Sequence, residues 1–147
     1  MEVTVQKILR QKGTEVLTTD PSSTVYDAIA RMVDHNVGSI LVVQNGDIEG
    51  IFTERDYLRR IVLEGRTSKT TRVDEIMTTD VVWVDPSYTA DECMALMTEH
   101  KCRHLPVLKD NELAGIISIG DCVKQVSRTA RSRVEELQKY ISGQYPA

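Results

Sequence analysis

The sequence predicts a mixed α/β (α+β) fold, in which two β-α-β-β-α units are related by a pseudo-two-fold axis and followed by a long C-terminal helix. The stretch Gly50–Asp56 recurs as Gly115–Asp121, with a glycine, two apolar residues, a hydroxyl residue, two variable residues and an aspartate in each copy. Residues 16–57 align without a gap on residues 81–122, and 12 of these 42 pairs are identical. A shared register of this length indicates a structural repeat. After Asp121, apolar residues continue at helical spacing for roughly 20 residues.

Composition limits the class of protein. The chain has 147 residues, of which 41% are hydrophobic and 27% charged, as in ordinary soluble proteins. A net charge of −4 argues against nonspecific nucleic-acid binding, which needs a positive surface. We expect no membrane span, because no run of about 18 apolar residues occurs. Met1–Lys7 shows no apolar signal core. The scattered Cys93, Cys102 and Cys122 form no CxxC pair, so we expect buried free thiols in the cytoplasm.

The first unit begins with an amphipathic lead-in over residues 3–15, with Val5, Ile8 and Leu9 on one helical face. Val16–Thr19 is expected to be a short strand, and Asp20–Ser23 a turn with several capping oxygens. Helical spacing predicts a helix from Thr24 to Asn36; its inward residues are Val25, Ala28, Ile29 and Met32.

A hairpin and a second helix complete the first unit. Ser39–Val43 is apolar and β-branched, as in a strand buried on both faces, and Asn45-Gly46 is a strong two-residue hairpin signal. Ile48–Thr53 is the returning strand. The hydroxyl and the aspartate that end the repeated stretch suit the start of a helix, which is expected over Asp56–Leu63. Its predicted inward residues are Tyr57, Leu58, Ile61 and Val62.

The second unit repeats this order. We place the first unit with its lead-in at residues 3–64, a polar connector at 65–72, the second unit at 73–127 and a helical extension at 128–147. A unit of about 60 residues has difficulty burying enough apolar surface alone, so the two units are expected to share a core. Thr89–Glu92 forms a capping box that opens the second long helix.

These residues resemble the CBS domain family, named for cystathionine β-synthase, whose domains occur in tandem pairs called Bateman modules. The resemblance covers residues 3–127. It rests on the doubled glycine-to-aspartate stretch, the two Asp-Pro-Ser turns, the strand entry at His104–Val107 and the introducing segment Val73–Met77. It implies the β-α-β-β-α fold in each unit, sheets of the two units that face each other, and a disc-like homodimer of two modules.

The resemblance also implies two ligand clefts between the units. Many members bind adenosine nucleotides there, with the aspartate on the ribose hydroxyls and the serine or threonine beside the ribose or phosphate. A carboxylate suits this role because it accepts hydrogen bonds from two neighbouring hydroxyls. Carried onto this sequence, the first cleft would comprise Thr53, Arg55, Asp56, Val81, Val82, Arg103, His104 and Pro106. The second would comprise Val16, Gly38, Ser39, Ile40, Ser118 and Asp121.

The two predicted clefts differ in charge. Arg103 and His104 of the second unit stand where the first unit has Gly38 and Ser39, so only the Asp56 cleft is expected to have basic residues. The Asp121 cleft has no local cation by this interpretation. We therefore expect the Asp56 cleft to bind a phosphorylated nucleotide more tightly.

The expected function is that of a non-catalytic regulatory sensor. It would bind adenine nucleotides, AMP before ADP or ATP, and transmit a conformational change to a separate regulated protein or to the oligomer. No catalytic residues, metal site or required cofactor are expected, since the sequence has no Walker loop, HExxH or His/Cys cluster with metal spacing. Two alternatives stay open: a module that binds NAD or an S-adenosyl compound, and a structural dimerisation module with empty clefts. Asp56 and Asp121 could also serve only as helix caps.

Overall fold

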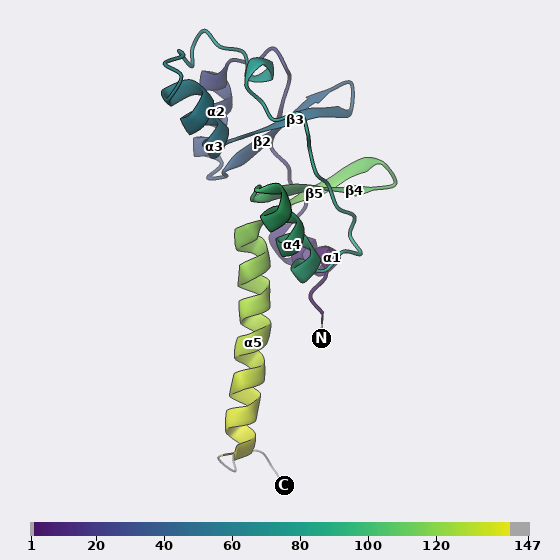
Figure 1. Ribbon diagram of the computed structural model, residues 1–147. Coiled ribbons are helices and arrows are strands. Elements are labelled where there is room, and N and C mark those ends of the chain that lie inside the picture. Colours follow the sequence, from purple (N-terminus) through teal and green to yellow (C-terminus); the bar gives the residue numbers. More distant parts are fainter. Residues whose placement is uncertain (1, 142–147) are drawn as a thin grey trace. The chain divides into compact units, whose positions relative to one another are not determined.

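The computed structural model describes the backbone of residues 2–141 and the side chains of residues 2–138 (Figure 1). The chain divides into two compact units: the first unit is Glu15–Val82, and the second unit joins Met1–Thr14 to Trp83–Ala147. Residues 142–147 of the predicted extension 128–147 lie outside the described residues. The mixed helix-and-strand architecture is confirmed, and the order of helix, two-stranded hairpin and helix recurs in both units.

The lead-in segments belong to units other than those that sequence order suggests. Helix α1 (Val5–Lys12) packs in the second unit, where the Val5 amide donates to the Tyr88 carbonyl oxygen at 2.8 Å. The 3₁₀ turn Val73–Glu75 packs in the first unit, with its Val73 amide 2.8 Å from the Ser23 carbonyl oxygen. The predicted boundaries at 3–64 and 73–127 assign each lead-in segment to the unit that comes after it in the sequence. The compact units instead include each lead-in segment in the unit where its apolar residues are buried.

The first unit has a three-stranded sheet in the order β1-β2-β3, formed by β1 (Thr18–Thr19), β2 (Ser39–Gln44) and β3 (Asp47–Thr53). β1 is parallel to β2, and β3 is antiparallel to it. Positive φ angles of 54° at Asn45 and 83° at Gly46 match the predicted two-residue hairpin. Helix α2 (Val25–Asp34) lies against β2. The core is made by apolar residues of these elements, of the helical turn that follows β3 and of the segment after the connector: Val25, Ala28, Met32, Ile40, Val42, Phe52, Ile61, Val73 and Ile76.

The second helix of the first unit begins earlier than predicted and changes its winding. Helix α3 (Glu54–Tyr57) continues directly into a π-helical turn at Leu58–Val62. Ile61 is buried, as expected, but the prediction of inward side chains is wrong for Leu58 and Val62, which are 57% and 52% exposed. The wider π turn moves these side chains away from the positions that α-helical spacing gives them.

The connector is tied to the start of α2. The Val25 and Tyr26 amides, which have no partner within their own helix, donate to the carbonyl oxygens of Thr71 and Ser68 at 2.9 and 3.0 Å. Thr71 is buried, and its hydroxyl donates to the Thr67 carbonyl oxygen at 2.8 Å. Backbone hydrogen bonds therefore fix this segment to the start of α2, and it is not a loose link.

The second unit contains helix α4 (Ala90–His100), the hairpin β4 (His104–Lys109) and β5 (Glu112–Ser118), and helix α5 (Ile119–Ile141). Thr89 and Glu92 form the predicted capping box. The counterpart of β1 is reduced to a single parallel bridge between Val84 and Val107. In the first unit the Leu41 amide donates to the Leu17 carbonyl oxygen. The equivalent residue of the second unit is Pro106, which has no N–H to donate, so the pairing there is shorter.

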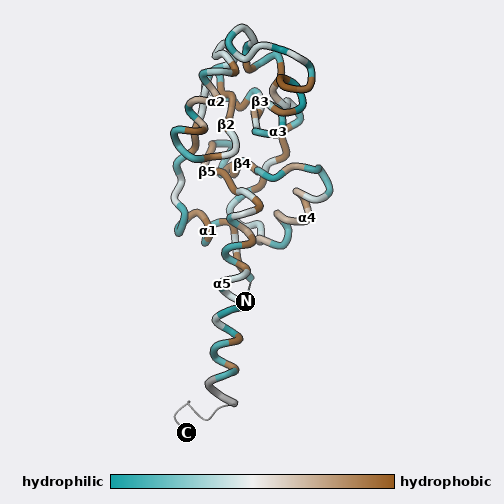
Figure 2. Tube along the Cα trace, turned by 90° about the vertical axis from the view of Figure 1, so that its left-hand side faces the viewer, coloured by the Kyte–Doolittle hydropathy of each residue, from teal (hydrophilic) through white to brown (hydrophobic). Residues whose placement is uncertain are grey.

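Helix α5 runs well past the other elements of the second unit (Figure 1). Its start packs on α4, α1 and β5. From Ala130 to Gln138 every residue is exposed, and the hydrophobic positions stand singly among hydrophilic ones (Figure 2). Among residues 2–141, no helix combines the length and the apolar character needed to cross a bilayer.

Candidate functional site: two repeated corners

The first repeated corner is the junction of β3 and α3. The Thr53 hydroxyl caps the helix by accepting from the Asp56 amide at 3.2 Å, and Asp56 Oδ2 accepts from the Thr53 amide at 3.0 Å. Asp56 Oδ1 accepts from the Thr78 hydroxyl at 3.2 Å. Both side chains are half-buried. The corner is thus a partly exposed carboxylate held in place by a capping box and by a neutral hydroxyl.

The second repeated corner is the junction of β5 and α5. Asp121 Oδ2 accepts from the Ser118 amide at 2.9 Å, and the Asp121 amide donates to the Ser118 hydroxyl at 3.1 Å, as in the first corner. Here, however, the carboxylate is paired with an ammonium: Lys12 Nζ lies 2.6 Å from Asp121 Oδ2 and 2.9 Å from the Ile116 carbonyl oxygen. The Lys12 and Asp121 side chains are 31% and 22% exposed, so the ion pair is only partly shielded.

This ion pair determines the protonation of Asp121. Burial by itself would raise the pKa of Asp121, but the hydrogen bonds from Lys12 and from the Ser118 amide, with the charge of Lys12, hold the pKa below its ordinary value. The carboxylate is therefore ionised at neutral pH. It can accept hydrogen bonds from hydroxyl groups of a ligand, provided that Lys12 moves or shares it.

The prediction that the Asp121 site lacks a local cation is wrong. Lys12 supplies one from α1, which packs in the second unit, although the sequence assigned the lead-in to the first. No sequence signal relates two residues so far apart. Sequence reasoning also missed Thr78, although a hydroxyl residue directly after the introducing segment Val73–Met77 was a usable signal.

Each corner stands beside the start of the neighbouring strand in its own unit. Ser39 pairs with Thr53, and the Glu54 amide donates to the Gly38 carbonyl oxygen at 3.2 Å. In the second unit His104 pairs with Ser118, and the Ile119 amide donates to the Arg103 carbonyl oxygen at 2.9 Å. Within single units, the structure therefore brings Thr53 and Asp56 to Gly38 and Ser39, and Ser118 and Asp121 to Arg103 and His104.

The remaining predicted site residues differ in exposure. Ile40 and Pro106 are buried in β2 and β4, Arg55 is exposed in α3, and the residues Val16, Val81 and Val82 are half-buried. The two predicted clefts combine residues of both units and stay predictions. Among the described residues no cluster of His, Cys, Asp and Glu could hold a metal ion.

The repeat has a counterpart among known families. A family model of the CBS domain matches residues 6–63 and 73–128. The chain belongs to the CBS domain family. CBS-domain pairs are generally non-catalytic regulatory modules. The two matched ranges show that this protein contains two CBS domains in tandem.

Known CBS proteins resemble the chain over most of its length. CBS domain-containing protein CBSX3, mitochondrial, of Arabidopsis thaliana is 41% identical over 153 residues, which cover 97% of this chain and 73% of the relative. The solved structure of a protein with CBS domains from Burkholderia ambifaria MC40-6 is 54% identical with a TM-score of 0.82, covering 84% of this chain and 93% of that chain.

Two other solved structures concern the assembly and the ligands of CBS-domain proteins. The hexameric CBS-CP12 protein from bloom-forming cyanobacteria is 30% identical with a TM-score of 0.75, covering 84% of this chain and 67% of that chain. The CBS domain pair of protein MJ0100 was solved in complex with 5′-methylthioadenosine and S-adenosyl-L-methionine. It is 21% identical with a TM-score of 0.75, covering 88% of this chain and 99% of that chain, and this likeness concerns the fold alone.

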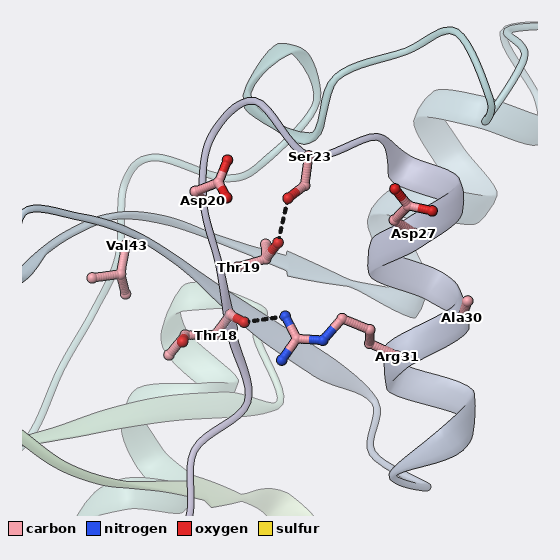
Figure 3. A pocket seen from close by; sticks show the side chains of 8 residues that line it. All are labelled: Thr18, Thr19, Asp20, Ser23, Asp27, Ala30, Arg31 and Val43. Carbon is pink, nitrogen blue, oxygen red and sulfur yellow. Dashed lines mark hydrogen bonds between the residues drawn. The ribbon is translucent and has the colours of Figure 1, made fainter.

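The CBS pair also has two surface hollows that repeat. One, of about 680 Å³, lies in the first unit (Figure 3). It is lined by Thr18, Thr19, Asp20, Ser23, Asp27, Ala30, Arg31 and Val43. The other, of about 500 Å³, lies in the second unit and includes Trp83, Asp85 and Leu108, the counterparts of Thr18, Asp20 and Val43.

These hollows are separate from the repeated corners. β1 pairs in parallel with β2, so Asp20 lies toward the Val43 end of β2, whereas Ser39 at the other end pairs with Thr53. The polar groups of the larger hollow bond to one another: Arg31 donates to the Thr18 carbonyl oxygen, and the Thr19 and Ser23 hydroxyls lie 2.6 Å apart. The hollow therefore resembles a solvated groove rather than a prepared ligand site.

Proposed function

We propose that this CBS pair is a sensor of adenine nucleotides, with AMP as the favoured ligand and ADP or ATP as related ones. The observation that carries the proposal is the pair of repeat-equivalent carboxylates, Asp56 and Asp121, each fixed by a hydroxyl residue three positions earlier and each partly exposed. Such a carboxylate can accept hydrogen bonds from both hydroxyls of a ribose. The adenosine compounds bound by the CBS pair of MJ0100 support the ligand class.

The proposed ligand clefts combine the two units, as the family resemblance implies. Binding between units whose contacts differ in the free and bound forms would shift a two-state equilibrium, and this is how the signal would arise. The proposed lining of the first cleft is Thr53, Arg55, Asp56, Val81, Val82, Arg103, His104 and Pro106. The proposed lining of the second is Val16, Gly38, Ser39, Ile40, Ser118 and Asp121, and we add Lys12 because its ammonium lies 2.6 Å from Asp121.

Calorimetry with AMP, ADP, ATP, NAD and S-adenosylmethionine tests the proposal on the full chain. We expect two sites for AMP, of which Asp56→Ala removes one and Asp121→Ala the other. Asp47→Ala is the matched control, because Asp47 is an exposed aspartate at the start of β3. An unchanged number of sites in both variants would exclude a role for the carboxylates. No heat with any of the five compounds would favour a purely structural module.

S-adenosyl compounds are the second candidate, and the MJ0100 complex is the observation that favours them. They share the ribose with AMP, so the same carboxylates would serve, but they carry a sulfonium cation in place of a phosphate. A Kd for S-adenosylmethionine well below that for AMP would assign the protein to this class. NAD would be assigned in the same way.

We also propose that a second copy of the chain covers the exposed apolar face at the end of the first unit, which gives a disc-like homodimer. Leu58, Val62 and Leu63 are 57%, 52% and 80% exposed on adjacent turns. Oligomerisation of the CBS-CP12 protein shows that CBS pairs can associate. Light scattering should give a dimer for the natural chain and a monomer for Leu63→Asp. A dimer of unchanged stability in this variant would place the contact elsewhere.

Helix α5 is the proposed output element. Val134 and Leu137 are 52% and 62% exposed on its projecting half, and the basic residues Arg128 and Arg131 precede the acidic Glu135. An antiparallel α5 of a second copy would set these opposite charges against each other. Deleting residues 128–147 should therefore weaken the dimer. An unchanged dimer mass at every concentration would instead leave α5 to the regulated protein.

The proposed compartment is the cytoplasm. Cys93 and Cys122 are buried and all three cysteines are free thiols, which agrees with a reducing environment. Fractionation of cells that express the tagged protein, with antibodies against markers of each compartment, measures this directly.

A further inference from the structure

In each corner one residue donates to two equivalent acceptors, an isoleucine carbonyl oxygen and the aspartate carboxylate. The donating residue differs between the corners. In the first unit Thr78 serves both: its amide donates to the Ile51 carbonyl oxygen at 2.8 Å and its hydroxyl to Asp56 at 3.2 Å. In the second unit Lys12 Nζ serves both: it donates to the Ile116 carbonyl oxygen at 2.9 Å and to Asp121 at 2.6 Å. Ile51 and Ile116 are repeat-equivalent, so a threonine in one corner has been replaced by a lysine side chain in the other.

This exchange changes the charge of the site. Asp56 accepts hydrogen bonds from the Thr53 amide and from the hydroxyls of Thr53 and Thr78, which are neutral donors. The ammonium of Lys12 neutralises Asp121. Lys12 reaches the carboxylate from the last turn of α1, and its four methylene groups allow the ammonium to change its direction.

A ligand that places hydroxyls on Asp121 must compete with Lys12. A neutral nucleoside would take one bond of the carboxylate and leave the ammonium without its strongest partner. A ligand that also carries a phosphate or carboxylate would offer the displaced ammonium a new anion, so the charge would be compensated again. Both groups are about one quarter to one third exposed, so a ligand can reach them.

We propose that Lys12 makes the Asp121 site selective for anionic ligands, by moving from Asp121 to the ligand's anionic group when the ribose binds. Thr78 is neutral and cannot make this exchange at the Asp56 site. Lys12 is thus a specificity-determining residue contributed by the lead-in helix. The inference rests on the proposed function, since it concerns how the Asp121 site chooses among adenosine compounds.

Calorimetry with adenosine and AMP in an Asp56→Ala background tests this on the full chain, because only the Asp121 site is then titrated. We expect AMP to bind about tenfold more tightly than adenosine or better, the size of one hydrogen bond to a charged group. Lys12→Gln keeps a donor but not the charge and should bring the ratio of the two Kd values close to one. Lys12→Arg should preserve the ratio, and Lys7→Gln, which removes an exposed lysine of the same helix, should leave it unchanged.

A second measurement uses the natural chain and does not depend on the folding of a variant. Acetylation of Lys12 relative to Lys7, followed by mass spectrometry, reports how accessible the ammonium is. Adenosine should increase the relative labelling of Lys12 by displacing it from Asp121, and AMP should decrease it. Equal changes with both ligands would overturn the inference.

The outcomes separate the two proposals. Binding of both ligands with a ratio that Lys12→Gln does not change would overturn the role of Lys12 and leave the proposed function intact. AMP binding by the natural chain but not in the Asp56→Ala background would also overturn it, since the Asp121 site would then take no nucleotide. No binding to the natural chain would refute the proposed function and the inference together.

Discussion

An alanine at Gly50 should destabilise the protein much more than an alanine at the equivalent Gly115. A Cβ at Gly50 would stand 2.7 Å from the Met77 sulfur and 2.7 Å from the Thr78 carbonyl oxygen. That carbonyl accepts from the Ile51 amide at 2.9 Å, and the Thr78 amide returns a bond to Ile51 at 2.8 Å. The new methyl group would therefore have to displace backbone that is held by two hydrogen bonds.

The same substitution at Gly115 meets only a side chain. The nearest atoms to the new Cβ belong to the end of Leu9, the first of them at 2.7 Å. A leucine terminus can rotate, whereas the Thr78 carbonyl cannot move without losing its bond. For Gly50→Ala we add about 1–2 kcal/mol of overpacking to about 1 kcal/mol for each of the two weakened hydrogen bonds, which gives about 3–4 kcal/mol. For Gly115→Ala we expect about 1 kcal/mol.

Urea unfolding followed by circular dichroism measures the difference between the two variants. Amide hydrogen exchange adds a local readout: Ile51 and Thr78 should exchange faster in Gly50→Ala and at the natural rate in Gly115→Ala. Equal losses of stability in the two variants would refute the reasoning. A larger loss in Gly50→Ala would also refute it if the Ile51 and Thr78 amides remained protected from exchange. In either case the close approach of Thr78 would not be what requires a glycine.

Three further predictions concern the described contacts. Because the pKa of Asp121 is lowered in the folded protein, its ionisation adds stability above the ordinary Asp pKa of about 3.9, and this stability is lost as the pH falls through the folded pKa. Urea midpoints between pH 6 and pH 3 should thus fall less in Lys12→Gln than in the natural chain; parallel curves would contradict the ion pair. The pKa of the Cys93 thiol is raised by its hydrogen bond to Cys122 and, to a smaller extent, by burial. A thiol reagent should therefore react with the buried Cys93 only after the protein unfolds. Labelling of the native protein as fast as the unfolded protein would exclude this packing. Thr71→Val should lower the free energy of unfolding by about 1–2 kcal/mol, because its buried hydroxyl donates to the Thr67 carbonyl oxygen at 2.8 Å. Thr70→Val should change this free energy little, because the Thr70 hydroxyl makes an exposed bond of 3.4 Å to the same oxygen. Equal effects of the two variants in urea unfolding would show that burial does not decide the result.

The repeat made much of each unit predictable. The strands β2 and β3 and the Asn45-Gly46 turn follow from apolar runs and from a dipeptide that tolerates positive φ. The capping geometry at both corners also follows from local chemistry, since a hydroxyl residue and an aspartate three positions later can each accept a hydrogen bond from the other's backbone amide at a helix start.

Other features depend on neighbours that the sequence does not place. The missing counterpart of β1 follows from Pro106, but only once the partner of that residue is known. Leu58 and Val62 were assigned inward by α-helical spacing, and the π turn exposed them. Whether a short helix changes from α to π geometry near its end depends on the residues around it. The periodicity of the sequence does not show these neighbours.

Sequence alone determined the repeat, the two corners and the family, because these rest on local hydrogen bonding and on a register shared by two stretches of chain. Tertiary structure decided which partner each carboxylate has. The lead-in helix packs in the second unit and brings Lys12 to Asp121, while the first unit keeps Thr78 on Asp56. An ion pair between residues at opposite ends of a chain forms only when packing brings both to one place, so two corners that share a capping motif hold their carboxylates with different donors.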